Sequence, residues 1–183
     1  MEIAGVKRDL PLCKLNENLS IAAFIIFGDV EVTVACAREL LNLVPSDSYD
    51  YLLTAEAKSI PLIHEMARQS GAETYFIARK KMKVYMPGAI SVKDKSITTE
   101  GDQQLFLGAD DAAKIKGKRV CIVDDVISTG GSLKAMESLV EQAGGIVVHK
   151  VAVLAEGDAA KRTDIKYLHP LPLFRADGTP ILD

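Results

Sequence analysis

The chain has 183 residues, of which 48% are hydrophobic and 26% are charged, and its formal net charge is −3. These values are typical of one globular domain and exclude an intrinsically disordered or collagen-like chain. The small negative charge disfavours a protein that binds nucleic acid through a broad basic surface. The longest apolar run, residues 21–27, is much shorter than the roughly 20 residues that a membrane-spanning helix needs. The first 20 residues also lack the apolar core of a signal peptide, so we expect a cytoplasmic protein with no membrane partner.

The first quarter of the chain predicts an irregular start followed by a strand and a helix. Residues 1–20 mix prolines and charges with short apolar stretches, and we expect irregular structure or a small strand there. Residues 21–27 predict a buried strand, because the run is short, rich in Ile and Phe, and followed by a Gly-Asp pair. Residues 30–44 predict a helix that ends before a Pro-Ser-Asp-Ser run. Its apolar stripe at helical spacing consists of Val30, Val34, Ala37, Leu41 and Val44.

The rest of the chain alternates strands and helices. The predicted strands are residues 51–54, 74–78, 120–123 and 146–154, and the predicted helices are residues 60–69 and 133–143. The continuous apolar run at 120–123 is typical of a central parallel strand that is buried on both faces. This alternation predicts an α/β fold with a largely parallel sheet. Residues 79–117 interrupt it with a long polar excursion, which is usually functional or disordered.

The strongest signal is the string at residues 120–132, Val-Cys-Ile-Val-Asp-Asp-Val-Ile-Ser-Thr-Gly-Gly-Ser. An apolar strand ends in two carboxylates, Asp124 and Asp125, and a loop rich in Gly, Ser and Thr leads into a helix. Ligands of open α/β sheets bind at the carboxyl ends of strands, and a helix N-terminus with free N–H groups suits a phosphate monoester. Adjacent carboxylates accept hydrogen bonds from a vicinal diol or help to hold a sugar chelated to Mg²⁺. The string therefore predicts a site for a sugar with a 5′-phosphate, whereas an acidic turn before a Ser/Gly helix cap is the alternative.

This string resembles the phosphoribosyl diphosphate (PRPP) binding motif of the type I phosphoribosyltransferases, with Cys121 as a mild departure. Residues 56–62, Glu-Ala-Lys-Ser-Ile-Pro-Leu, resemble the loop that binds the PRPP pyrophosphate in purine phosphoribosyltransferases and in a related purine repressor. Residues 79–83, Arg-Lys-Lys-Met-Lys, resemble the basic string of adenine phosphoribosyltransferases, and residues 4–10 resemble the start of the hood over their base. The whole chain is similar to a bacterial subgroup of proteins related to adenine phosphoribosyltransferase.

The resemblance implies the α/β fold of type I phosphoribosyltransferases, with a parallel sheet flanked by helices, all in one domain of residues 1–183. A small hood would come from about residues 1–20 plus the C-terminal segment. A mobile loop at about residues 84–107 would close over PRPP and exclude water. The resemblance also implies a homodimer, because in the adenine family the equivalent of Arg79 can reach the neighbouring subunit's site.

The implied reaction transfers phosphoribosyl from PRPP to a purine base and releases pyrophosphate, with Mg²⁺ held mainly through PRPP and not directly by the protein. Asp124 and Asp125 would bind the ribose hydroxyls and stabilise the cationic transition state. Pyrophosphate is a highly charged leaving group that needs cations and backbone donors. The implied 5′-phosphate ligands are Ser128, Thr129, Gly130, Gly131 and Ser132, and the implied pyrophosphate ligands are Ala57, Lys58, Arg79, Lys80 and Lys83. For the basic string alone, a solvated charge run is the alternative.

The general acid and the base pocket are less well specified. In adenine enzymes the mobile loop supplies a glutamate, and here Thr99 aligns with it while Glu100 follows, so Glu100 is the candidate acid or else an ordinary loop residue. By position, Val6, Arg8 and Glu156 are expected to line the base pocket. A 6-oxopurine needs a donor such as lysine, and residues 155–157 contain none, which favours adenine.

Two alternatives remain open. The first is a phosphoribosyltransferase for xanthine, hypoxanthine or guanine. The second is a regulator that senses PRPP without turnover, like the purine repressor. Such a regulator needs a DNA-binding module, and we disfavour it because this chain starts at the predicted hood and has a negative net charge.

Overall fold

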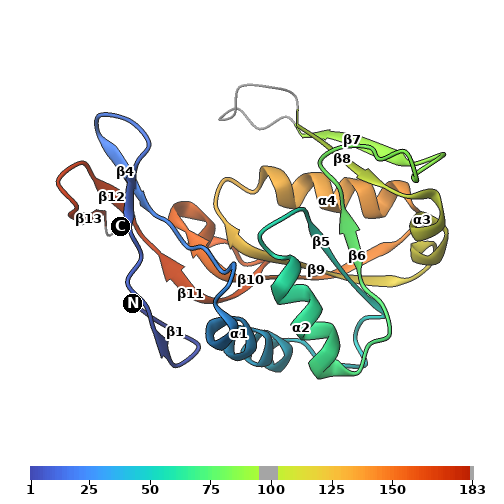
Figure 1. The fold of residues 1–183 in the computed structure, drawn as a ribbon, viewed down its shortest axis with the longest axis horizontal. Coiled ribbons are helices and arrows are strands. Elements are labelled where there is room, and N and C mark those ends of the chain that lie inside the picture. The colour runs from blue at the N-terminus through green and yellow to red at the C-terminus, as the bar shows by residue number, and fades with distance from the viewer. Residues whose placement is uncertain (95–102, 182–183) are drawn as a thin grey trace.

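A five-stranded parallel sheet forms the centre of the protein (Figure 1). The structure is a computed structural model, and it describes residues 1–94 and 103–181. The strand order is β11-β10-β9-β5-β6, and all four neighbouring pairs are parallel. The strands are β5 (Tyr51–Ala55), β6 (Phe76–Ala78), β9 (Arg119–Ile127), β10 (Ile146–Glu156) and β11 (Lys166–Leu171). The predicted parallel sheet with residues 120–123 in its central strand is confirmed.

Helices cover both faces of this sheet (Figure 1). One face carries α1 (Val30–Leu43) and α2 (Ile60–Ser70), and the other carries α3 (Ala109–Ile115) and α4 (Gly131–Gln142). Cys121 and Val123 of β9 belong to the first apolar core, whereas Val120 and Ile122 belong to the second. Burial on both faces explains why this strand is apolar without alternation. No helix in the described parts of the chain is long and apolar enough to cross a membrane.

The two ends of the chain meet in a separate antiparallel sheet, at the left of Figure 1. Its strand order is β13-β12-β4-β3, formed by β3 (Leu12–Lys14), β4 (Leu19–Ala22), β12 (Leu173–Arg175) and β13 (Pro180–Ile181). A two-stranded ribbon of β1 (Glu2–Ile3) and β2 (Val6–Lys7) precedes it. This terminal sheet meets the carboxyl end of β10, because a Cβ atom on Gly157 would lie only 3.2 Å from the Leu173 side chain. Gly157 opens the short 3₁₀ helix Gly157–Lys161 that follows β10.

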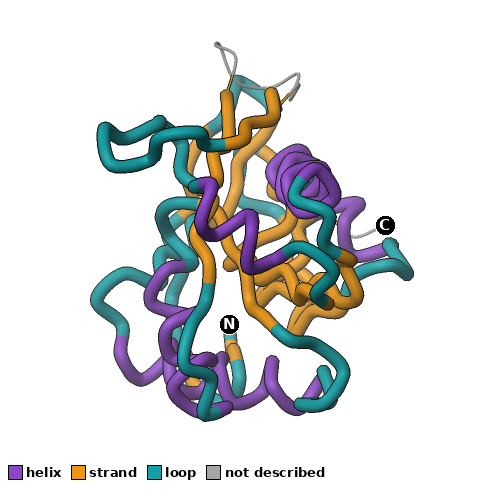
Figure 2. The backbone as a smooth tube through the Cα atoms, turned by 90° about the vertical axis from the view of Figure 1, so that its right-hand side faces the viewer, coloured by secondary structure: helices purple, strands orange, loops and turns teal. Residues whose placement is uncertain are grey.

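A hairpin of β7 (Ile90–Asp94) and β8 (Gln103–Leu107) occupies much of the segment expected to be a loop. Figure 2 shows the hairpin at the top of the view, and it packs against α4, because Leu105 and Leu107 of β8 share the second apolar core with that helix. The hairpin is tied to the basic string because Arg79 and Phe106 exchange two backbone hydrogen bonds of 2.8 Å. Thr99 and Glu100 lie outside the described residues, so the role expected for Glu100 stays a prediction.

The predicted strand at residues 21–27 is wrong. Strand β4 ends at Ala22, where its last pairing is with Leu12 of β3. The following residues find no partner strand within the described chain, although Phe24 and Ile26 are buried while Ile25 and Phe27 are exposed. Beyond Ala22 the run is apolar because Phe24 and Ile26 reach the core, and not because it belongs to a sheet.

The inward face of α1 also differs from the predicted stripe. Ala37 and Val44 of that stripe are buried, but Val30 and Val34 are 73% and 37% exposed, and Val32, Cys36 and Leu40 are buried instead. The helix itself is confirmed, and it starts where Asp29 accepts a hydrogen bond of 3.1 Å from the Val32 N–H group. Since α1 carries apolar residues on several sides, helical spacing alone did not determine which side packs inward.

The two faces of α1 predict different costs of truncation. We expect Leu40→Ala to lower the free energy of unfolding by about 2–5 kcal/mol, because it leaves a cavity in the core. Val34→Ala serves as the control on the same helix and should change it by less than about 0.5 kcal/mol. Urea unfolding of the two variants measures the difference, and equal losses would contradict the observed orientation.

Candidate functional site

A pocket of about 200 Å³ opens at the carboxyl ends of β5 and β9. Its lining comes from the loop after β5, the basic string, β8, β9 and the first turn of α4, and it consists of Ala55, Glu56, Ala57, Lys58, Ser59, Lys80, Leu105, Asp124, Asp125, Val126 and Ser132. The register that pairs Leu53 with Ile122 places the loop after β5 level with the acidic pair. The structure thus brings the acidic pair together with Ala57, Lys58, Lys80 and Ser132, four residues for which a role in PRPP binding stays a prediction.

The acidic pair lies inside β9 and not in a loop after it. The prediction that the strand ends at the carboxylates is wrong, because the ladder with β10 continues to the pair Ile127 and Ala155. Asp125 is 6% exposed, and Asp124 is half-buried. The continued ladder fixes the backbone of both acids, so their side chains start from a rigid base.

Ser59 holds both carboxylates from the neighbouring loop. Its hydroxyl oxygen lies 3.0 Å from Asp124 Oδ1 and 3.1 Å from Asp125 Oδ1, and it accepts a 2.7 Å hydrogen bond from the Asp125 N–H group. The Asp125 N–H group also lies 3.0 Å from Asp124 Oδ1. The sequence analysis assigned no role to Ser59, because a serine just before a helix is usually a helix cap.

The electrostatics of the pair favour a ligand that brings hydrogen-bond donors or positive charge. Burial raises the pKa of Asp124, and the nearby charge of Asp125 raises it further, while the Ser59 hydrogen bond works in the opposite direction. Lys58 Nζ lies 3.5 Å from Asp125 Oδ2. That oxygen is buried and has no hydrogen-bond donor among the described residues. A pocket-lining acid with spare acceptor capacity can receive a ligand hydroxyl.

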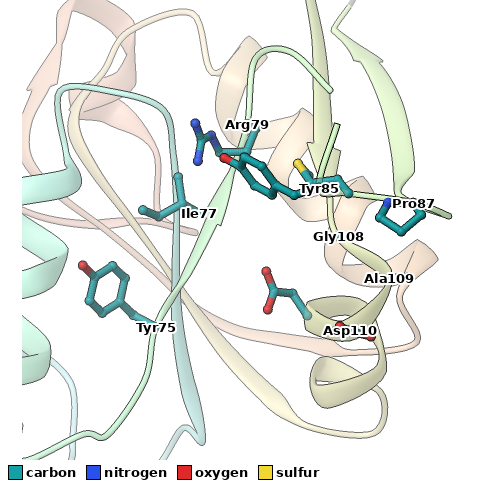
Figure 3. Close-up of a pocket in the computed structure, with 10 residues that line it drawn as sticks. Tyr75, Ile77, Arg79, Tyr85, Pro87, Gly108, Ala109 and Asp110 are labelled. Carbon is teal, nitrogen blue, oxygen red and sulfur yellow. The ribbon is translucent and has the colours of Figure 1, made fainter. Parts of the chain in front are cut away.

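The basic string divides between two pockets. Lys80 lines the pocket of the acidic pair, whereas Arg79 lines a second pocket of about 350 Å³, shown in Figure 3 together with Tyr85 and Asp110. Glu56 holds the start of the string, since its carboxylate lies 3.2 Å from Arg79 Nη2 and accepts a 2.9 Å hydrogen bond from the Lys80 N–H group.

Burial disfavours the charged form of the Glu56 carboxylate and by itself would raise its pKa. The hydrogen bonds with the Lys80 N–H group and the Arg79 side chain outweigh this effect, so the pKa is lowered. Lys83 is half-buried and belongs to the lining of neither pocket. The structure therefore does not bring Arg79, Lys80 and Lys83 into one pocket.

The predicted phosphate loop, residues 128–132, joins β9 to α4, and its hydroxyl side chains are exposed to solvent. Ser128, Thr129 and Ser132 are exposed, and α4 begins at Gly131. Gly130 has a positive φ of 81°, and a Cβ atom there would lie 2.6 Å from Arg162 Nη1. Position 130 therefore requires glycine both for its backbone conformation and for the close approach of the guanidinium.

The Arg162 side chain that approaches Gly130 is itself held in place by an ion pair. Its guanidinium binds both oxygens of Asp164, at 2.9 and 2.7 Å, and Lys150 adds an ion pair of 2.6 Å to the same carboxylate. The sequence analysis did not find Arg162, because it lies far along the chain from the glycine that it approaches.

The three residues expected at the base are dispersed. The Arg8 guanidinium donates hydrogen bonds of 2.7 and 3.0 Å to Asp29 and one of 2.8 Å to Glu31. Val6 is half-buried and packs against the first core. Glu156 ends β10 and is 9% exposed. Of these residues, Glu156 lies at the same edge of the sheet as the acidic pair, because Ala155 pairs with Ile127 of β9.

The chain was compared with known proteins. The family model for the phosphoribosyl transferase domain matches residues 35–170. A hypoxanthine/guanine phosphoribosyltransferase of Methanocella paludicola is 37% identical over 112 residues, which cover 61% of this chain and only about half (54%) of the relative's length. An adenine phosphoribosyltransferase of Petrotoga mobilis is 27% identical over 161 residues, which cover 82% of this chain and 88% of the relative.

A solved structure shares the fold. The adenine phosphoribosyltransferase of Thermoanaerobacter pseudethanolicus superposes with a TM-score of 0.71 at 21% identity, over 88% of this chain and 95% of that one. The family match begins within α1 and reaches β11, so it includes the acidic pair and the loop that faces it. The chain therefore belongs to the phosphoribosyl transferase domain family and has its type I α/β fold.

Proposed function

We propose that this protein transfers the phosphoribosyl group of PRPP to a purine base. The observation that carries the proposal is the convergence of Asp124, Asp125, Lys58 and Lys80 on one pocket at the carboxyl edge of the sheet. A sugar diphosphate needs this combination, since acceptors serve the ribose hydroxyls and cations serve the diphosphate. The relatives named for hypoxanthine/guanine and for adenine support a purine as the acceptor.

The chemistry assigns a separate task to each part of the pocket. The bond between the sugar C1′ and the diphosphate oxygen breaks, and its electrons leave with pyrophosphate. A ring nitrogen of the base forms the new bond to C1′ and loses its proton, which the departing pyrophosphate or water accepts. Asp124 and Asp125 accept hydrogen bonds from the ribose hydroxyls and stabilise the positive charge on the ring, while Lys58 and Lys80 neutralise the departing pyrophosphate. Residues 128–132 and the N-terminus of α4 hold the 5′-phosphate.

Mg²⁺ fits this pocket as an ion held by the substrate. Within residues 1–94 and 103–181, no group of three or more His, Cys, Asp and Glu side chains is placed to hold a metal. The acidic pair, whose Asp125 Oδ2 accepts no hydrogen bond from a described residue, instead suits an ion whose ligands come mainly from the diphosphate and water. When bound, the ion neutralises part of the charge on the leaving group.

Glu156 supports adenine over a 6-oxopurine. Glu156 is 9% exposed, and its carboxylate makes no side-chain hydrogen bond or ion pair with any described residue. It stands between the acidic pair and the terminal sheet, which we propose as the hood over the base. A carboxylate accepts a hydrogen bond from an exocyclic amino group but is repelled by a carbonyl oxygen. The archaeal relatives named for hypoxanthine and guanine favour the 6-oxopurines as the second candidate substrates.

The first experiment measures pyrophosphate release from PRPP with Mg²⁺ over adenine, hypoxanthine, guanine and xanthine, with uracil and orotate as negative controls. We expect turnover with a purine and the highest kcat/KM with adenine. Asp124→Asn and Asp125→Asn should each lower kcat/KM by about 100-fold or more, because they remove charge that faces the transition state. Thermal unfolding of both variants serves as the folding control. Full activity in both variants, or no turnover with any purine, would contradict the proposal.

A second prediction concerns the base. Glu156→Gln keeps the size of the side chain but adds an N–H donor, so the preference for adenine over hypoxanthine should fall by about 10- to 100-fold. The measurement is the ratio of kcat/KM for the two bases. Glu141→Gln, on the exposed side of α4, is the matched control and should leave the ratio unchanged. An unchanged ratio in Glu156→Gln would remove this residue from the base pocket.

A third prediction concerns the phosphate loop. Gly130→Ala should weaken PRPP binding by about 10-fold or more, because a positive φ disfavours alanine by roughly 1–2 kcal/mol and the new methyl group meets the fixed Arg162 guanidinium. Gly144→Ala imposes similar strain, with a φ of 78°, at the other end of α4. It should lower stability without changing PRPP affinity. Calorimetric titration with Mg²⁺ and PRPP measures the affinity of both variants, and thermal unfolding measures their stability. Equal losses of affinity would refute a local effect at Gly130.

A further inference from the structure

Ser59 occupies a helix-capping position without capping the helix. It is the residue before α2, where a serine hydroxyl normally accepts a hydrogen bond from an N–H group of the first turn. Among the described residues its side chain makes no such bond, and it points instead to Asp124 and Asp125. The hydroxyl is almost completely buried, with 1% of the residue exposed. A residue that forgoes a local stabilising interaction for contacts with a buried acidic pair indicates a role in the site.

Two consecutive residues of this loop hold the two oxygens of Asp125. Ser59 Oγ lies 3.1 Å from Oδ1, and Lys58 Nζ lies 3.5 Å from Oδ2. The contacts differ in character, because Ser59 is buried at the end of a short side chain, whereas the Lys58 side chain is 54% exposed on a flexible stem. One contact is therefore fixed, and the other is free to move.

We propose that Ser59 is a positioning residue that keeps the ribose-binding carboxylates in place when Lys58 turns to the pyrophosphate. This inference rests on the proposed function. In the structure both loop residues hold Asp125. Once PRPP is bound, its diphosphate competes for Lys58 with more negative charge than a single carboxylate carries. Ser59 then remains as the link between the pyrophosphate loop and the acidic pair.

The donor and acceptor contacts of the Ser59 hydroxyl suit it to this positioning role. It has one proton to donate, and two carboxylate oxygens lie within 3.1 Å to receive it. One of its two lone pairs accepts the hydrogen bond from the Asp125 N–H group at 2.7 Å. That N–H group also has Asp124 Oδ1 as an acceptor at 3.0 Å, so it stays satisfied if the hydroxyl is removed. Loss of the hydroxyl therefore disturbs the carboxylates more than the backbone.

The test compares two buried hydroxyls that both reach β9. Ser59→Ala removes the contact with the carboxylates. Thr54→Val is the matched control, because Thr54 is buried in β5 and donates a 2.7 Å hydrogen bond to the Val123 carbonyl oxygen, just before the acidic pair. Ser59→Thr keeps the hydroxyl and tests for rescue. The measurements are PRPP affinity with Mg²⁺ by calorimetry, the KM values for PRPP and for the base, and crystal structures of the unliganded variants.

We expect Ser59→Ala to weaken PRPP binding by about 10- to 100-fold, the usual effect of losing a hydrogen bond to a charged group. The KM for the base should stay unchanged, Thr54→Val should bind PRPP like the wild type, and Ser59→Thr should recover most of the affinity. In the unliganded Ser59→Ala crystal the Asp125 carboxylate should turn toward Lys58.

Three outcomes overturn the proposal in distinguishable ways. Wild-type affinity in Ser59→Ala, or carboxylates that keep their positions in its crystal structure, removes the positioning role while the proposed function stands. An equal loss of affinity in Thr54→Val assigns the effect to the general stability of β9. Wild-type protein that binds no PRPP overturns the proposed function and the role of Ser59 with it.

Discussion

The pairing of β9 with a parallel strand on each side is the constraint on which the site depends. β10 pairs with it from Arg119 to Ile127, β5 pairs with it from Val120 to Ile122, and apolar cores cover both of its faces. The register is therefore fixed, since a slip of one residue would exchange the faces to which every side chain points. Asp124 and Asp125 are carried to the edge of the sheet on this rigid strand. The loop after β5 reaches the same edge, which is why Lys58 and Ser59 meet the acidic pair.

Burying two adjacent carboxylates opposes folding, and the structure compensates for it incompletely. Ser59, the Asp125 N–H group and Lys58 supply donors and positive charge, yet Asp125 Oδ2 keeps no hydrogen bond within the described chain. A well-packed apolar pair at these positions would be easier to bury. The pair is therefore better explained by a ligand that completes its hydrogen bonds than by a contribution to stability.

The sequence predicted those features that depend on local pattern. Apolar periodicity was sufficient for four of the five parallel strands and for α1, α2 and α4, but not for β11, and the string at 120–132 identified the acidic pair. Features set by packing between distant segments were not predictable. The inward face of α1, the lack of partner strands after Ala22 and the approach of Arg162 to Gly130 all depend on residues far away in the chain. The role of Ser59 was not predicted because its position before a helix predicts a helix cap. Its hydroxyl points to the carboxylates only because β9 packs beside the loop after β5.

The turn after β5 connects the parts of the site that handle opposite charges. Glu56 binds Arg79 and the Lys80 backbone, whereas Lys58 and Ser59 bind Asp125. While the Arg79 guanidinium is paired with Glu56, it does not line the pocket of the acidic pair. Among the described residues that line this pocket, the cations are Lys58 and Lys80, whose single ammonium groups sit on flexible stems. A lysine can move from a carboxylate to a phosphate without losing a fixed bidentate geometry, and a buried serine beside it preserves the carboxylate that the lysine leaves.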